Sequence, residues 1–106
     1  MVKIKLAAMD IDGTLIGKNK ILTKRTKDAL NGAAARGIHL VIASGRALQA
    51  VPGELLKIQG MEYVITSNGS SVFRLADQKR IYGRDMTPEQ IGQLITFYDA
   101  YDCPME

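Results

Sequence analysis

The sequence predicts an α/β fold, a three-layer, Rossmann-like sandwich built on a parallel sheet. Apolar segments at residues 2–9, 38–43 and 62–66 alternate with segments of helical spacing at residues 22–36 and 47–58. Each apolar segment also runs directly into a polar loop. A βαβαβ order has right-handed crossovers, so these three loops are expected to gather at the carboxyl ends of the strands.

Length and composition indicate one folded unit without a membrane span. The chain has 106 residues, of which 46% are hydrophobic, and this is enough for one core. No uninterrupted apolar run approaches the roughly 18 residues of a membrane span, so we expect a cytoplasmic protein with no membrane partner. Cys103 is the only cysteine and excludes an internal disulfide. The basic cluster at residues 18–27 has no interleaved aromatic residues, which favours a solvated face over a nucleic-acid site.

The first strand and the first helix have clear boundaries. Residues 2–9 alternate and then run apolar, which predicts a strand that stops at Asp10. Residues 22–36 predict a helix with Thr23 as the N-cap and Gly37 at the C-terminal cap.

The second strand and the segment after it are less regular. Residues 38–43 are almost continuously apolar, as in a parallel strand covered on both faces, and they end at a Ser-Gly-Arg loop. Residues 47–58 have helical spacing, but Pro52 and Gly53 are expected to kink that helix or restart it.

The remaining elements follow from strand and capping patterns. Residues 62–66 predict a third strand, residues 67–69 a turn, and residues 72–75 with 80–82 a hairpin. A Thr-Pro-Glu-Gln sequence at residues 87–90 predicts a capping box that opens a final helix.

The loop after the first strand carries a pair of carboxylates. In extended geometry Ile11 points one way, and Asp10 and Asp12 point the other, so both acids can face one site. Such oxygens suit Mg²⁺, and Asp10 could attack phosphorus while Asp12 transfers protons. Gly13 permits a tight backbone approach, and Thr14 can donate to phosphate or cap the turn. The alternative is an ordinary strand-to-turn junction, where Asp and Gly are common for backbone reasons.

Three segments together resemble one enzyme superfamily. Met-Asp-Ile-Asp-Gly-Thr-Leu at residues 9–15 resembles the first signature motif of the haloacid dehalogenase superfamily, DxDGT(L/V). Ile-Ala-Ser-Gly-Arg at residues 42–46 resembles the second motif, and its Gly-Arg pair is similar to the Cof-type phosphatase subgroup. Ile-Thr-Ser-Asn-Gly at residues 65–69 resembles the Asn-Gly segment of that subgroup. The resemblance covers essentially the whole chain in the right order.

The resemblance implies roles for the residues that match its motifs. Asp10 would be the nucleophile and a metal ligand, and Asp12 the general acid/base that offers its backbone carbonyl to Mg²⁺. Ser44 would bind the transferring phosphoryl group, although a helix N-cap is an alternative role for its hydroxyl.

The same resemblance implies that Gly13, Thr14 and Gly45 lie against phosphate or substrate. Arg46 and Asn68 would lie nearer the substrate. For Arg46 a surface salt bridge is an equally good interpretation, and for Asn68 a left-handed turn residue is a serious alternative.

The resemblance also implies that two motifs are absent. The superfamily's phosphate-binding lysine and its second acidic pair lie beyond a cap insertion, so residues 1–83 would be a partial core domain and residues 84–106 the start of a C2-type cap. We therefore expect weak Mg²⁺ binding and very low turnover by this chain alone. Residues 2–9 would form an exposed edge, which predicts a homo-oligomer or a complementing fragment.

Three functional hypotheses follow. The leading one is a Mg²⁺-dependent phosphomonoester hydrolase that acts on small phosphorylated metabolites such as sugar phosphates, through an aspartyl-phosphate. The chain could instead be a non-catalytic fragment or remnant that binds metal or phosphate or assembles with partners. The third hypothesis, a phospho-acceptor module like a response regulator, conflicts with the DxDGT string.

Overall fold

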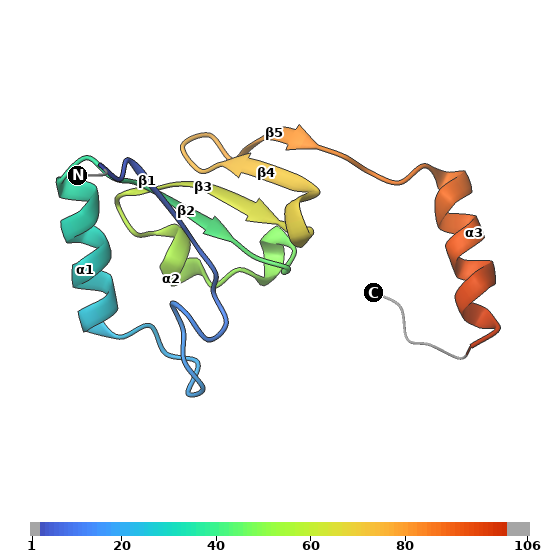
Figure 1. Cartoon of the computed structure of the whole chain (residues 1–106), viewed down its shortest axis with the longest axis horizontal. Helices are drawn as coiled ribbons and strands as arrows, with labels where there is room; N and C mark the ends of the chain where they lie inside the picture. The colour runs from blue at the N-terminus through green and yellow to red at the C-terminus, as the bar shows by residue number, and fades with distance from the viewer. Residues whose placement is uncertain (1–2, 102–106) are drawn as a thin grey trace.

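The computed structural model describes residues 3–101 as a sheet with two helices packed near it and a third helix that stands apart (Figure 1). Val2 of the expected first strand and Cys103 lie outside the described residues. The elements, in chain order, are β1 (Leu6–Met9), α1 (Lys24–Ala35), β2 (His39–Ala43), η1 (Leu48–Ala50), α2 (Gly53–Leu56), β3 (Met61–Thr66), η2 (Ser67–Gly69), β4 (Ser71–Arg74), β5 (Lys79–Gly83) and α3 (Pro88–Asp99).

The sheet confirms the predicted α/β class but is mixed rather than purely parallel. Its strand order is β1-β2-β3-β4-β5. The first three strands pair in parallel, whereas β4 and β5 pair antiparallel, because the predicted hairpin adds itself to the edge of β3. The carboxyl ends of β1, β2 and β3 therefore meet at one end of the sheet, as expected.

The first strand is shorter than predicted. Its ladder with β2 begins at the pair Leu6 and His39, and residues 3–5 are assigned to no strand. Just before the ladder, the His39 N–H donates to the Lys5 carbonyl over 2.8 Å. The apolar alternation continues before Leu6, but β2 begins only at His39. The residues before Leu6 therefore have no β2 residue opposite them with which to pair.

Both predicted caps of α1 are present. The Thr23 side chain accepts a hydrogen bond from the Thr26 N–H, so the first helical residue is Lys24. At the other end, Gly37 has a φ of 85°, and the Ile38 N–H donates to the Ala33 carbonyl over 3.2 Å. This is the Schellman arrangement, and it turns the chain directly into β2.

The predicted helix over residues 47–58 is divided into two short pieces. The 3₁₀ turn η1 ends before Val51, and α2 restarts at Gly53 with Pro52 as its N-cap. Pro52 has a φ of −57° and no N–H to continue a ladder, so the restart occurs at the dipeptide expected to cause it.

The core lies between the sheet and one helical layer. The strand order advances in one direction from β1 to β3, so right-handed crossovers place α1 and α2 on the same face. Residues 3–101 thus supply one of the two helical layers of the expected sandwich. One cluster contains Leu30 of α1, Leu55 of α2 and the strand residues between them. Its buried members are Ile11, Leu15, Ile16, Leu30, Leu40, Ile42, Val51, Leu55, Ile58, Met61 and Val64.

The contact between α1 and the loop before β3 depends on Gly60. A Cβ atom at this position would lie 2.2 Å from the Ala34 Cβ, so the helix and the loop would have to separate. We expect Gly60→Ala to lower the free energy of unfolding by about 1–3 kcal/mol, the usual cost of overpacking. Urea unfolding would measure it, with Gly32→Ala as control, because a Cβ at Gly32 meets no atom within 4 Å. Equal stability of the two variants would contradict this contact.

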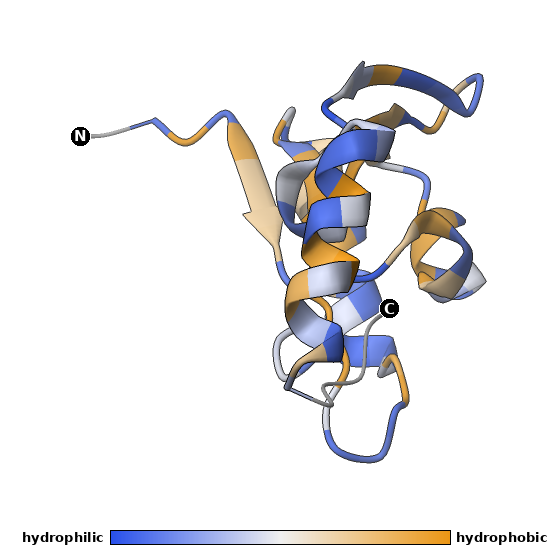
Figure 2. Cartoon of the chain, turned by 90° about the vertical axis from the view of Figure 1, so that its right-hand side faces the viewer, coloured by the Kyte–Doolittle hydropathy of each residue, from blue (hydrophilic) through white to orange (hydrophobic). Residues whose placement is uncertain are grey.

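Helix α3 begins as the sequence predicts. The Thr87 N–H donates to the Gln90 side chain over 2.9 Å, and the Gln90 N–H donates to the Thr87 hydroxyl over 3.1 Å, which completes the capping box. The helix has no buried residue, and orange segments along its ribbon in Figure 2 mark several hydrophobic residues. Those that are exposed are Ile91, Leu94, Ile95, Phe97 and Tyr98.

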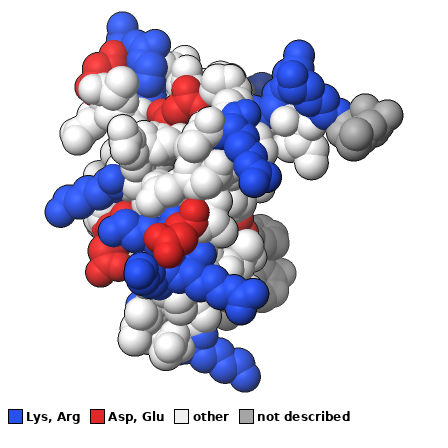
Figure 3. Space-filling model, turned by 90° about the vertical axis from the view of Figure 1, so that its left-hand side faces the viewer, with Lys and Arg blue, Asp and Glu red and all other residues white. Residues whose placement is uncertain are grey.

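The basic cluster is exposed. Lys18, Lys20, Lys24, Arg25 and Lys27 all lie at the surface. On the face shown in Figure 3, basic and acidic side chains are interspersed among neutral ones, which suits a solvated surface. Among residues 3–101, no helix has both the length and the apolar character that crossing a membrane requires.

Candidate active site

The loop after β1 separates its carboxylates from the core. Ile11 is fully buried, whereas Asp10 and Asp12 on either side of it are exposed, as the alternation predicts. The loop then closes on itself, because the Ile16 N–H donates to the Ile11 carbonyl over 3.0 Å. Gly13 has a φ of 79°, a left-handed conformation that favours glycine at this turn. The core contact of Ile11 therefore fixes the direction of both acids.

The loop after β2 holds a largely buried hydroxyl. Ser44 is 7% exposed, and its Oγ accepts a hydrogen bond from the Arg46 N–H over 3.0 Å. This hydrogen bond lies within the loop and satisfies one of its backbone N–H groups. The alternative role as a helix N-cap is not observed, since Ala47 occupies that position before η1. The serine oxygen accepts one bond and can donate its proton elsewhere.

The loop after β3 adopts a left-handed turn. Asn68 has φ and ψ of 56° and 33°, and Ser67 also has a positive φ of 49°. The Asn68 N–H donates to the Ser44 carbonyl over 3.2 Å, which ties this loop to the one after β2. Asn68 is thus the left-handed turn residue that the sequence allowed, and the same turn directs its side chain toward Gly45.

These three loops surround one pocket of about 360 Å³. Four of the predicted site residues line it: Asp10, Ser44, Gly45 and Asn68. Its other lining residues are Ala43, Ile65 and Gly69, which lie within the motif segments 42–46 and 65–69 but were assigned no role from the sequence. A carboxylate, a hydroxyl and a carboxamide from three consecutive strand ends therefore share one space.

Gly45 allows the close approach of two loops in this pocket. A Cβ atom there would lie 2.9 Å from the Asn68 Oδ1, the far end of a side chain that can turn away. We expect Gly45→Ala to change stability by less than about 1 kcal/mol but to displace Asn68 and weaken phosphate binding several-fold. Isothermal titration with inorganic phosphate and a thermal melt would measure both. Unchanged phosphate affinity would show that the Asn68 position does not matter.

Arg46 does not line the pocket but holds Asp12. Its Nη2 lies 2.5 Å from Asp12 Oδ1, and its Nε lies 3.0 Å from Asp12 Oδ2, a bidentate pair. These hydrogen bonds lower the pKa of the Asp12 carboxyl below its ordinary value, against a smaller opposing effect of desolvation. The salt-bridge interpretation of Arg46 therefore describes its geometry, and Asp12 is ionised at neutral pH while the pair is intact.

The predicted residues Gly13 and Thr14 lie in the loop beside the pocket rather than in its lining. Thr14 is exposed, and its N–H donates to the Ile11 carbonyl over 3.3 Å. Their contribution to the geometry is the turn that returns the chain from Asp12 to the buried Leu15.

The donor set suits a hard cation only in part. Within residues 3–101, no three His, Cys, Asp or Glu side chains come close enough together to hold a metal ion. The Asp12 carboxylate is hydrogen-bonded to Arg46, whereas the Asp10 carboxylate lines the pocket. Asp10 could serve Mg²⁺, which commonly binds proteins through one or two carboxylates and retains several waters.

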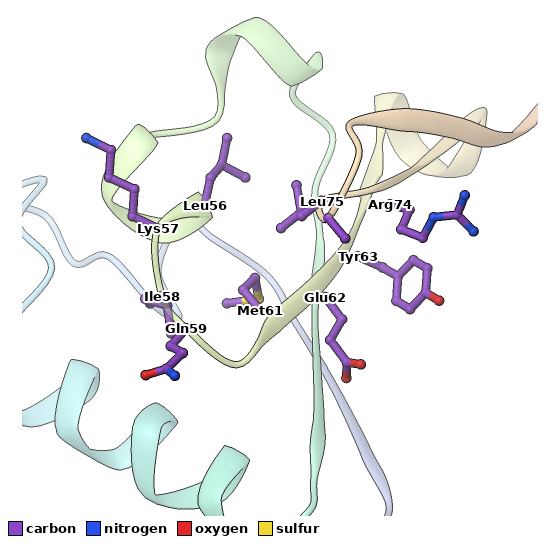
Figure 4. A pocket seen from close by; sticks show the side chains of 10 residues that line it. Leu56, Lys57, Ile58, Gln59, Met61, Glu62, Tyr63, Arg74 and Leu75 are labelled. Carbon is purple, nitrogen blue, oxygen red and sulfur yellow. The ribbon is translucent and has the colours of Figure 1, made fainter.

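A second pocket, of about 440 Å³, lies at the opposite end of β3 (Figure 4). In Figure 4, Leu56, Met61 and Leu75 form its apolar part. Of its three charged residues, Arg74 pairs with Asp77 and Glu62 with His39, and the third is Lys57. This lining offers no carboxylate beside a buried hydroxyl, so the first pocket is the candidate active site.

Comparison with known proteins identifies the family of this chain. Residues 7–105 match the family model described as haloacid dehalogenase-like hydrolase. The chain is 39% identical over 109 residues to the putative phosphatase YxeH of Bacillus subtilis, an alignment that covers 96% of this chain and 37% of that protein. It is 31% identical over 85 residues to the 5-amino-6-(5-phospho-D-ribitylamino)uracil phosphatase YcsE of the same organism, covering 76% and 34%.

A solved structure gives the same result. The subclass IIB sugar phosphatase BT4131 superposes with a TM-score of 0.80 at 28% sequence identity, covering 92% of this chain and 38% of that protein. The chain thus spans about a third of the length of the proteins that it matches. The family match and the shared fold confirm the resemblance seen in the three motifs, and the chain belongs to the haloacid dehalogenase-like hydrolases.

Proposed function

We propose that this chain carries the phosphoryl-accepting part of a Mg²⁺-dependent phosphomonoester hydrolase, with Asp10 as the nucleophile. One observation carries the proposal: Asp10, Ser44 and Asn68, from three consecutive strand ends, line a single pocket. The phosphatases among its relatives support the same reaction class.

The proposed reaction has two displacements at phosphorus. An Asp10 carboxylate oxygen attacks the phosphorus atom, the bond to the ester oxygen breaks, and the leaving alkoxide takes a proton from solvent water to give the alcohol. Water then attacks the aspartyl-phosphate, releases inorganic phosphate and restores the Asp10 carboxylate. Bound Mg²⁺ would offset the repulsion between the phosphate and the carboxylate.

Ser44 and Asn68 would orient the phosphoryl group. The Ser44 oxygen already accepts from the Arg46 N–H, which leaves its own proton to donate to a phosphoryl oxygen. The Asn68 amide could donate from the opposite loop. Gly13 and Thr14 would add the close backbone and hydroxyl of the first loop. Asp12, an ionised carboxylate beside this pocket, would accept the proton of the attacking water.

The substrate class that we propose is a small phosphorylated metabolite of the sugar-phosphate kind. The names of two relatives support it, a sugar phosphatase and a phosphatase of a phosphoribityl compound. We propose further that residues 1–83 belong to the core domain and residues 84–106 to a cap. The end of β5 at Gly83 and the separation of α3 from the sheet support this boundary.

We propose that a further strand, from outside the sheet described above, pairs with the free edge of β1. Among residues 3–101, β1 ends the sheet, and Leu6 on it is 55% exposed. An apolar edge strand offers unpaired backbone groups to another chain or segment. Either a second copy or a complementing part of the protein would satisfy them.

Trapping of the covalent intermediate tests the proposed function. The chain would be mixed with acetyl phosphate and Mg²⁺, quenched in acid, and digested for mass spectrometry. We expect one phosphoryl group on the peptide that contains Asp10, and its loss on treatment with hydroxylamine. If the phosphoryl group is absent or lies elsewhere, the non-catalytic alternative replaces this proposal.

A further inference from the structure

Arg46 makes hydrogen bonds to all three loops of the candidate site, more than either a substrate contact or a surface salt bridge would need. Its guanidinium binds both oxygens of Asp12 in the loop after β1. Its backbone N–H donates to the Ser44 Oγ, and its carbonyl accepts from the Ser67 N–H over 3.0 Å. One residue therefore joins the loops that follow β1, β2 and β3.

The side chain of Arg46 is also anchored behind Asp12. Its Nη1 donates to the Ala50 carbonyl in η1 over 2.9 Å, and the side chain is only 28% exposed. Each of the three nitrogens of the guanidinium thus makes one hydrogen bond, two of them to Asp12 and one to η1. Arg46 is absent from the pocket lining that contains Asp10 and Ser44. These contacts leave the guanidinium turned to Asp12 rather than to a phosphate bound beside Asp10.

We propose that Arg46 is a positioning residue that acts through Asp12, and that it does not bind the phosphoryl group of the substrate. The bidentate fork fixes both oxygens of Asp12 and therefore its direction relative to Asp10, two residues earlier. Lysine would keep the positive charge but would hold one oxygen as a point charge, so it would not fix the carboxylate plane. The inference rests on the proposed function, because it assigns Asp12 a part in the reaction.

Steady-state kinetics separate the two roles of Arg46. With p-nitrophenyl phosphate and Mg²⁺, we expect Arg46→Lys to lower kcat about 10- to 100-fold and to change KM less than about threefold. If Arg46 bound the substrate directly, Arg46→Lys would instead raise KM and the dissociation constant of inorganic phosphate. Arg25→Lys on α1, an exposed arginine, is the matched control and should change neither value.

A double-mutant cycle tests whether Arg46 acts through Asp12. In an Asp12→Asn background, Arg46→Lys should reduce kcat less than about twofold further, because the group that it positions has already lost its function. A full additional loss of 10-fold or more, or a phosphate affinity that falls in both backgrounds, would overturn the proposal.

A measurement independent of turnover distinguishes failure of this inference from failure of the proposed function. In nitrogen-15 NMR spectra, the Arg46 Nε–H should be protected and shifted in the wild-type chain and should lose both features in Asp12→Ala. An unprotected Nε–H in the wild type overturns the positioning role alone. Turnover no faster than that of Asp10→Asn, with a protected Nε–H, overturns the proposed function and with it the role assigned to the pair.

Discussion

Replacement of Asp10 by asparagine is expected to reduce hydrolysis of p-nitrophenyl phosphate by at least about 10³-fold, or to the uncatalysed background if the wild-type rate is low. Such a loss corresponds to about 4 kcal/mol of transition-state stabilisation. The amide is close to the carboxylate in size but is a poor nucleophile, so the step at phosphorus should fail while the pocket keeps its shape. Release of p-nitrophenol with Mg²⁺ present measures this effect.

The matched control for this prediction is Asp28→Asn. Asp28 is exposed on α1, away from the three loops, and the change removes the same charge. It should leave the rate within about twofold of the wild type. If the wild-type rate exceeds the uncatalysed background and Asp10→Asn has the same rate, then Asp10 carries no chemistry, whatever its position in the pocket.

Replacement of Ile42 by alanine is expected to lower the free energy of unfolding by about 2–5 kcal/mol. Ile42 is fully buried in β2, between β1 and β3, and it belongs to the cluster that α1 and α2 cover. Removal of its outer carbons leaves a cavity that strands paired on both sides cannot easily close. Urea unfolding followed by circular dichroism would measure the change.

Ile81→Ala serves as its control. Ile81 lies in β5 at the far edge of the sheet and is 46% exposed, so the same deletion should cost less than about 1 kcal/mol. A cost at Ile42 no larger than that at Ile81 would contradict the position of the core between β2 and the helices.

Much of the fold and part of the site could be predicted from local sequence. The capping pairs at Thr23 and Thr87 and the glycine at Gly37 fix helix ends through neighbouring residues, so a sequence pattern reveals them. The gathering of Asp10, Ser44 and Asn68 followed from strand ends alone, because parallel strands joined by crossovers share one carboxyl end.

Features that depend on distant residues could not be predicted in this way. The start of β1 at Leu6 is set by where β2 begins, which the apolar pattern of residues 2–9 does not contain. The contact of Arg46 with Asp12 joins residues 34 positions apart, so the sequence left a substrate contact and a salt bridge equally open. The capping box of α3 likewise specifies where the helix starts and not what it touches, so its position away from the sheet was implied only by the family resemblance, which assigns residues 84–106 to a cap.

The buried side chain of Ile11 between two exposed acids links correct folding to a correct site. If the chain slipped by one residue at the end of β1, isoleucine would turn toward water and two carboxylates would enter the core. Burial of unpaired carboxylates costs several kcal/mol each, so such a molecule would hardly persist. A chain in which Asp10 is misaligned is therefore also an unstable chain, so the folded molecules are those with Asp10 in the correct position.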